Sequence, residues 1–174
     1  MSESVQGHRE AAPETVRVAV LTISDTRTPE TDTGGDVVEE TMRGAGHEVV
    51  AREIVRDEAT SIRTTLVDLL ARPDVDAVVT TGGTGISGRD TTYEVVERMV
   101  EKRLDGFGEL FRMLSYEEIG AAAMLSRALA GAVGTKLVAS LPGSRNAVRL
   151  GMEKLLVPEV AHIVFELRKH QEKG

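Results

Sequence analysis

The sequence predicts one α/β domain, in which helices cover both faces of a mostly parallel central sheet in a three-layer α/β/α arrangement. Apolar β-branched runs alternate along the chain with segments of helical periodicity. This order is typical of parallel strands joined by right-handed crossovers. The chain has 174 residues, of which 41% are hydrophobic and 28% charged, so it can bury one core of ordinary globular composition.

The first half of the chain reads as three strands separated by two helices. The strands are buried β-branched runs, and the helices show apolar residues at helical spacing and end at Gly or Pro. In order, we predict a strand at Val16–Ile23, a helix at Gly34–Gly46, a strand at His47–Val55, a helix at Ser61–Ala71 and a strand at Val75–Thr81.

The second half continues the pattern with a more helical composition. We predict, in order, a helix at Thr91–Lys102, two or three short helices within Phe107–Arg127, a short strand near Ala130–Val133, a strand at Lys136–Leu141, a helix capped by Ser144 that runs to about Leu156, and a last helix from Pro158 to near His170. Residues 1–15 are polar and are predicted to form a flexible N-terminal arm, which leaves 16–170 as the domain.

Composition argues against several functions. A net charge of −7 and an aromatic content of 3% disfavour a nucleic-acid partner. The chain has no cysteine, which excludes disulfides, thiolate metal sites and cysteine nucleophiles and fits a cytoplasmic protein. The four histidines are scattered, and no apolar run approaches membrane-spanning length, so we expect no histidine zinc site and no membrane partner.

Ligands of open α/β sheets bind beyond the carboxyl ends of the strands, so the loops that follow the strands matter most. The loop after the third strand, Thr80–Asp90 (TTGGTGISGRD), is called the glycine loop below. Its glycines allow backbone amides to approach an anion closely, and the helix that follows adds a positive end. We predict a phosphate site here from the amides of Gly82, Gly83 and Gly85, the hydroxyls of Thr81, Thr84 and Ser87, and the side chain of Arg89. The alternative is a tight turn that needs glycine only for chain reversal.

Two nucleotide fingerprints match the spacing of this loop but fail on context. Gly83, Gly85 and Gly88 satisfy the dinucleotide pattern GxGxxG, yet they follow the third strand and not the first. The spacing of Gly83 and Gly88 also resembles a P-loop, but Arg89 and Asp90 stand where Lys and Ser or Thr are expected. A nicotinamide oxidoreductase is therefore disfavoured.

Asp57 and Asp90 are candidate metal ligands. A carboxylate beside a phosphate cradle repels the phosphate unless a cation lies between them, and Mg²⁺ typically binds one or two carboxylates plus substrate phosphates. The alternatives are that Asp90 caps the helix after the glycine loop and that Asp57 only forms its turn. Ser24 and Asp25 after the first strand, and Pro142, Gly143 and Ser144 after the last, are predicted to complete the ligand-binding edge.

Three arginines and one aromatic run are each compatible with two roles. Arg89, Arg145 and Arg149 are either positive charges at the same edge or solvated surface residues. The run around Phe107, Leu110, Phe111 and Leu114 is most simply part of the core or of a subunit interface.

Several motifs together resemble the MoaB/MogA family of molybdenum-cofactor biosynthesis proteins. They are ISDT (Ile23–Thr26), TDTGG (Thr31–Gly35), VRDEA (Val55–Ala59), the glycine loop, GFGELFRMLSYEEIG (Gly106–Gly120), LSRALAG (Leu125–Gly131) and LPGS (Leu141–Ser144). The resemblance runs from about Val16 to Arg168, and its MoaB branch looks closest.

The resemblance implies an activity as well as a fold. MogA-like members adenylylate molybdopterin: its terminal phosphate attacks the α-phosphate of Mg-ATP, which gives molybdopterin-AMP and pyrophosphate. In that family the glycine loop and the LPG turn surround the nucleotide. The two aspartates needed for the magnesium-dependent step correspond to Asp57 and Asp90. The resemblance also implies a homotrimer or a dimer of trimers. The alternative is a non-catalytic molybdopterin-binding protein, since some MoaB-like paralogues are not the adenylyltransferase.

Overall fold

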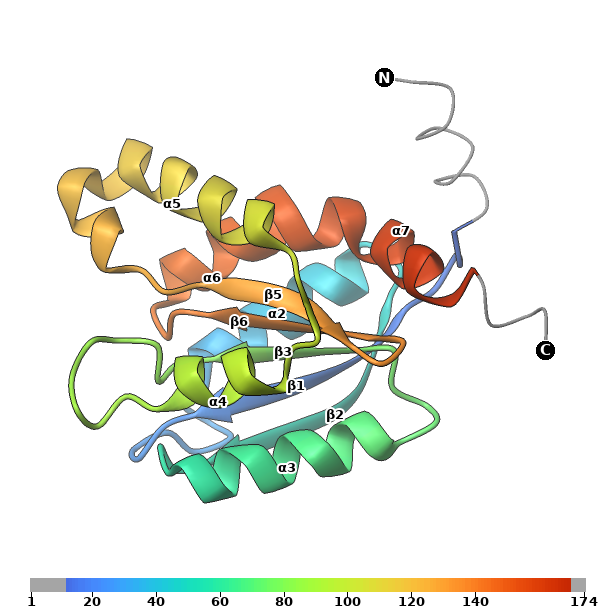
Figure 1. Ribbon diagram of the computed structural model, residues 1–174, viewed down its shortest axis with the longest axis horizontal. Coiled ribbons are helices and arrows are strands. Elements are labelled where there is room, and N and C mark those ends of the chain that lie inside the picture. The colour runs from blue at the N-terminus through green and yellow to red at the C-terminus, as the bar shows by residue number, and fades with distance from the viewer. Residues whose placement is uncertain (1–11, 170–174) are drawn as a thin grey trace.

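Residues 12–169 are described by a computed structural model, and they form one α/β unit with helices on both faces of a central sheet (Figure 1). The predicted fold class is confirmed. The strands are β1 (Arg17–Ile23), β2 (Glu48–Val55), β3 (Ala77–Thr81), β4 (Lys102–Arg103), β5 (Leu129–Val133) and β6 (Lys136–Leu141). The helices are α2 (Thr33–Gly44), α3 (Ala59–Ala71), α4 (Thr92–Met99), α5 (Asp105–Ile119), the 3₁₀ segment η1 (Gly120–Leu125), α6 (Arg145–Gly151), the π segment η2 (Met152–Leu156) and α7 (Val157–Arg168).

The six strands lie in the order β2-β1-β3-β6-β5-β4. The first four are mutually parallel, whereas β5 and β4 are antiparallel to their neighbours. Ile23 pairs with Val55, and Thr81 pairs with both Thr22 and Leu141, so the four parallel strands end level with one another. Their carboxyl ends therefore meet at one edge, which we call the rim.

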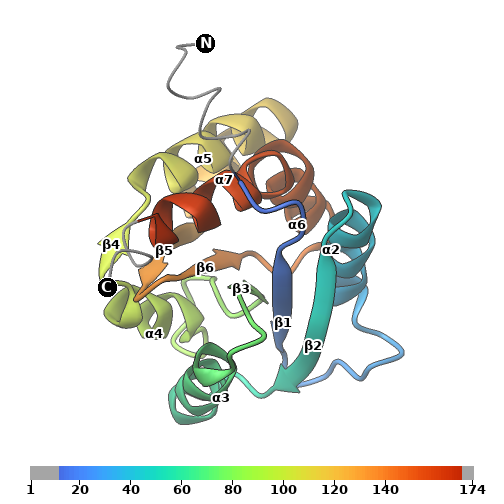
Figure 2. The ribbon, with the colours of Figure 1, turned by 90° about the vertical axis from the view of Figure 1, so that its right-hand side faces the viewer.

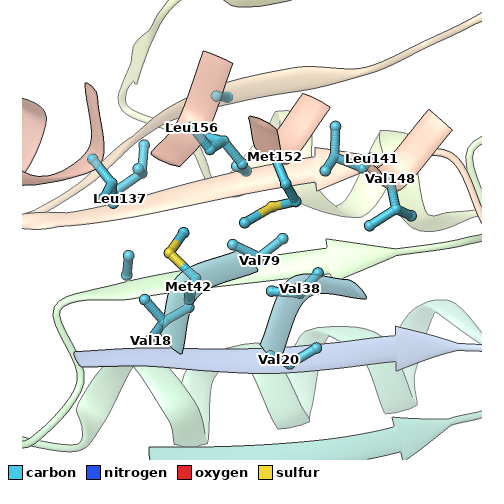
Figure 3. Close-up of a cluster of buried hydrophobic side chains, with 14 of the residues drawn as sticks. Val18, Val20, Val38, Met42, Val79, Leu137, Leu141, Val148, Met152 and Leu156 are labelled. Carbon is cyan, nitrogen blue, oxygen red and sulfur yellow. The ribbon is translucent and has the colours of Figure 1, made fainter. Parts of the chain in front are cut away.

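The two faces of the sheet bury separate apolar cores. Helices α2, α5, α6 and α7 lie on one side of the sheet, and α3 and α4 lie on the other (Figure 2). Figure 3 shows the larger core, where Met42 of α2 and Met152 of η2 meet β-branched residues of β1 and β3 such as Val18 and Val79. Both methionines are fully buried, and their unbranched side chains fill the irregular space between helix and sheet.

Two expectations about helices were wrong in detail. The segment predicted as two or three short helices is one helix of 15 residues, α5, followed by η1. Its glycines are not breaks: a Cβ at Gly108 would lie 2.8 Å from the carbonyl oxygen of Ala128, so this glycine permits close packing. Phe107 and Phe111 are buried in the core and Leu114 is half-buried, whereas Leu110 is exposed.

The boundary near Pro158 also differs from the expectation of two separate helices. The chain stays helical from α6 through η2 into α7. The amide of Val157 donates to the carbonyl of Met152, five residues earlier, in the wider π pattern. This shift accommodates a proline in the first turn of α7, because proline has no amide to donate.

One strand was missed, and one segment is only partly described. Helix α4 ends at Met99, and Lys102 and Arg103, predicted at the end of the helix or just beyond it, pair with Ala132 and Gly131 as β4. Residues 1–11 of the predicted arm, and His170 at the predicted end of the last helix, lie outside the described residues. Within the described part, the Thr15 hydroxyl donates to the carbonyl of Gly46, and Val16 is fully buried. No helix among residues 12–169 is long and apolar enough to cross a membrane.

Candidate phosphate-binding site

The glycine loop and the loop after β6 touch each other at the rim. The amide of Gly82 donates to the carbonyl of Leu141 at 3.0 Å. A Cβ on Gly143 would lie 3.1 Å from the Cα of Gly82, and one on Gly82 would lie 2.3 Å from the carbonyl oxygen of Ile23. Gly82 has φ +93°, a conformation that favours glycine. Three strand ends therefore converge on one point only because side chains are absent there.

Consecutive backbone amides in these two loops have no partner within residues 12–169. Unpaired amides follow one another at Gly83, Thr84, Gly85 and Ile86 in the glycine loop and at Gly143 and Ser144 in the loop after β6. Unpaired amides that follow one another along a glycine-rich segment form concave sites for anions. The candidate site thus has unpaired donors on two neighbouring loops, but the amide of Gly82, which was also predicted to bind phosphate, is bonded to Leu141 instead.

Asp57 lies against the glycine loop, and the side chain of Asp90, the last residue of that loop, turns back against it. A Cβ at Gly83 would lie 2.7 Å from Oδ2 of Asp57, and a Cβ at Gly85 would lie 2.6 Å from Oδ2 of Asp90. Asp57 thus lies beside Gly83 and Asp90 beside Gly85, although Asp57 follows β2 and Asp90 follows β3. Asp90 does not cap α4, because the N-cap is Thr91, which makes no side-chain cap bond.

Each of these carboxylates has one oxygen engaged by the protein and one without a hydrogen bond within residues 12–169. Oδ1 of Asp57 accepts from the amide and hydroxyl of Thr91, at 3.1 and 2.8 Å. Oδ2 of Asp90 accepts from the amide and hydroxyl of Ser87, at 3.0 and 2.6 Å. These hydrogen bonds fix the orientation of each carboxylate. They leave Oδ2 of Asp57 and Oδ1 of Asp90 able to bind a cation. This donor set fits Mg²⁺, which typically takes one or two carboxylate oxygens besides substrate phosphates.

Arg89 is paired with Asp25, which links the loops after β1 and β3. The guanidinium of Arg89 donates two hydrogen bonds to Oδ2 of Asp25, and it lowers the pKa of that carboxyl below its ordinary value. Oδ1 of Asp25 accepts from the amide of Asp57 at 3.2 Å. Asp25 therefore connects the loops after β1, β2 and β3.

The hydroxyls predicted at the ligand-binding edge are mostly engaged within the protein. Thr81 is buried and donates to Thr22, and Ser144 caps α6 by accepting from Ala147. Ser24 accepts from the amides of Thr26 and Arg27. Thr84 is buried, and Pro142 is half-buried beside Gly143. Arg149 lies off the rim, where it pairs with Glu40 and Glu153.

Sequence reasoning missed a buried carboxylate beneath the rim. Asp32 is 2% exposed, caps α2 through the amide of Gly35 and accepts from the hydroxyl of Thr22 and the guanidinium of Arg52. Burial opposes the charge of Arg52, but hydrogen bonds to Glu39 and Asp32 outweigh that effect and raise its pKa. The TDTGG motif contained Asp32, but nothing local indicated a partner in β2.

Arg127, in the segment between η1 and β5, was also missed. Its guanidinium donates to carbonyls of the glycine loop, at Thr84 and Gly85. The LSRALAG motif contained this residue, but its spacing gave no sign of a contact 42 residues away.

A small cavity opens beside the contact of Gly82 and Gly143. Its volume is about 100 Å³, the size of a phosphate group or a few waters. The lining residues are Thr22, Ile23, Ser24, Arg27, Asp32, Gly34, Thr81, Gly82 and Gly143. A larger groove of about 410 Å³ lies between α3 and α4, but no residue of the glycine loop lines it, so we place the site at the rim.

Fold and site together define an open α/β protein with a candidate anion site at the carboxyl ends of its parallel strands. Residues 19–162 match the MoCF_biosynth family model, described as "Probable molybdopterin binding domain". The chain belongs to this family and, within it, to the MoaB/MogA proteins of molybdenum cofactor biosynthesis.

Its relatives support the same assignment over almost the full length. Molybdenum cofactor biosynthesis protein B of Bacillus cereus is 52% identical over 167 residues, which are 95% of this chain and 99% of the relative. The crystal structure of the tungsten cofactor synthesizing protein MoaB from Pyrococcus furiosus is 39% identical with a TM-score of 0.81, covering 90% of this chain and 99% of that one. The Mog protein of Mycobacterium ulcerans is 26% identical with a TM-score of 0.79, covering 87% and 99%.

Proposed function

We propose that this protein adenylylates molybdopterin in a magnesium-dependent reaction with ATP. The terminal phosphate of molybdopterin forms a bond to the α-phosphorus of ATP, the bond between the α- and β-phosphates breaks, and pyrophosphate leaves. The observation that supports this most is the approach of Asp57 and Asp90 to one loop with unpaired amides. The cytoplasm, where ATP is abundant and thiols stay reduced, is the proposed setting.

The arrangement suits a reaction that needs no side-chain nucleophile, because the attacking group is the substrate's own phosphate. What the protein must supply is alignment of two anions and neutralisation of their charge. Amides of Gly83 to Ile86, Gly143 and Ser144 would hold phosphate oxygens. The free oxygens of Asp57 and Asp90 would hold Mg²⁺, which supplies positive charge to the phosphates when it is bound.

The experiment is a pyrophosphate-release assay with ATP, Mg²⁺ and molybdopterin, run beside a binding measurement for molybdopterin. Release that depends on molybdopterin is the expected result. Tight binding of molybdopterin without release would instead assign a non-catalytic binding protein of the same pathway. The family description, which names binding alone, keeps this second candidate in view.

Asp90→Asn sharpens the assay because the amide is nearly isosteric with the carboxylate. Its carbonyl oxygen can still accept from the amide and hydroxyl of Ser87, while NH₂ replaces the oxygen proposed to bind Mg²⁺. We expect turnover to fall by on the order of 100-fold or more, with molybdopterin binding largely kept. Asp68→Asn, at an exposed position on α3, is the control. Equal loss of turnover and binding in Asp90→Asn would show a structural role.

We further propose that the protein assembles as a homotrimer or a dimer of trimers through one apolar face. Helix α5 and segment η1 expose six large apolar side chains, each at least 47% exposed: Leu110, Met113, Tyr116, Ile119, Met124 and Leu125. Contiguous apolar surface of this kind usually marks a contact with another protein. Light scattering of the purified protein tests the assembly.

A further inference from the structure

Each nitrogen of the Arg127 guanidinium donates a hydrogen bond within the described structure. Nε donates to the carbonyl oxygen of Thr84 at 2.9 Å, Nη2 donates to the carbonyl of Gly85, and Nη1 donates to the carboxylate of Glu94. The guanidinium carbon also lies 4.8 Å from the ring centroid of Tyr93. The side chain is 24% exposed, so this is a largely buried cation with fixed geometry.

The two carbonyl contacts determine where the neighbouring amides point. In a trans peptide, the C=O of one residue and the N–H of the next lie in one plane and point in opposite directions. Because the carbonyls of Thr84 and Gly85 both turn toward Arg127, the amides of Gly85 and Ile86 turn away from it. Successive carbonyls of an extended chain alternate in direction, whereas both of these carbonyls accept from the same guanidinium.

Those two amides are among the donors of the candidate phosphate site. They have no partner within residues 12–169, and consecutive amides that point the same way form an anion-binding nest. One guanidinium can bridge two carbonyls because its donors are spread in a planar fork, whereas an ammonium is a point donor on a flexible stem. Glu94 and Tyr93, both on α4, fix the guanidinium itself.

We propose that Arg127 is a positioning residue that orients the amides of Gly85 and Ile86 for the nucleotide phosphates without touching them. This inference rests on the proposed function, because it assigns a use to amides that the proposed reaction requires. It predicts that Arg127 determines the affinity for Mg-ATP and leaves the affinity for molybdopterin unchanged.

The experiment measures Mg-ATP and molybdopterin binding by calorimetry for the wild-type chain, Arg127→Gln and Arg127→Lys. We expect Arg127→Gln to weaken Mg-ATP binding by about 10- to 100-fold, since one misplaced hydrogen bond to a charged phosphate changes affinity by roughly this factor. Arg127→Lys should be intermediate, and molybdopterin binding should change less than about 2-fold in both. Backbone ¹⁵N order parameters at Gly85 and Ile86 should fall below about 0.6, while those of α3 stay at rigid values.

Arg103→Gln is the matched control, because Arg103 also pairs with an acid of α4, Glu97, but makes no contact with the glycine loop. If Arg127→Gln does not fold, the Mg-ATP affinity of Arg127→Lys is compared with that of Arg103→Gln, and weaker binding by Arg127→Lys alone supports the inference. If the wild-type chain binds Mg-ATP and the Arg127 variants bind it with the same affinity, this inference is overturned and the proposed function stands. A wild-type chain that does not bind Mg-ATP overturns the proposed function and this inference with it.

Discussion

Gly83→Ala tests whether the shape of the glycine loop depends on the missing side chain. Gly83 has φ +62°, and an added Cβ would lie 2.1 Å from Oγ1 of Thr92 and 2.7 Å from Oδ2 of Asp57. Both neighbours are buried, Thr92 at 0% and Asp57 at 9% exposed. The substitution therefore forces either the loop, the start of α4 or the candidate metal ligand to move.

The expected cost has two parts. A non-glycine residue in the left-handed region costs roughly 1–2 kcal/mol. Forcing a methyl group into a packed site costs roughly 1–3 kcal/mol. Together they predict a loss of about 2–5 kcal/mol in the free energy of unfolding, a large share of the roughly 5–15 kcal/mol typical of a domain. The proposed adenylylation activity should fall further if Asp57 is the group that moves, because Asp57 is a proposed metal ligand.

Urea denaturation measures the loss of stability, and the pyrophosphate-release assay on folded protein measures the loss of activity. Gly88→Ala is a control in the same loop: nothing lies within 4 Å of its added Cβ, and its φ is not positive. We expect that variant to stay within about 0.5 kcal/mol of the wild-type stability.

The double variant Gly83→Ala/Thr92→Ala isolates the clash. Removing Oγ1 of Thr92, which has no hydrogen-bond partner within residues 12–169, should recover about 1–2 kcal/mol, while the cost of positive φ remains. If Gly83→Ala is as stable and as active as Gly88→Ala, the reasoning is refuted. If the stability losses of Gly83→Ala and Thr92→Ala simply add in the double variant, the part that depends on Thr92 is refuted.

Two further predictions concern the rest of the molecule. Asp76 lies at the amino ends of the strands and is 2% exposed. Burial raises the pKa of its carboxyl, but hydrogen bonds from Arg17 and Arg168 outweigh burial and lower that pKa from 3.8 to about 2. A lowered pKa stabilises the fold above pH about 4, and that contribution disappears as the pH falls toward 2. Asp76→Asn should therefore lower the free energy of unfolding by about 2 kcal/mol at pH 6 and by almost nothing at pH 2 in urea titrations; a constant difference would contradict this. Met113→Glu on the exposed face of α5 should reduce the mass measured by light scattering, whereas Val67→Glu, a similarly exposed apolar position on α3, should not; an equal response of both variants would remove the assignment of the interface to α5.

The order and type of most elements could be predicted from the sequence because their signals are local. Apolar runs predicted β1, β2, β3 and β6, and the glycines after β3 predicted an open loop at the rim. The short strand β4 gave no such signal, because two exposed basic residues form it only by pairing with β5. Two or three short helices were predicted within Phe107–Arg127, but packing of Phe107 and Phe111 in the core accompanies one continuous helix, α5, despite its two glycines.

At the rim, the sequence by itself determined which residue types follow each strand, including both acids and the glycines of the candidate phosphate site. Only the tertiary structure decided how they are connected. Asp57 reaches Thr91 across 34 positions, Arg89 reaches Asp25 across 64, and Arg127 reaches Thr84 across 43. Periodicity and turn chemistry act within a few residues. These hydrogen bonds form because the carboxyl ends of the parallel strands and the amino end of antiparallel β5 bring separate loops to one edge.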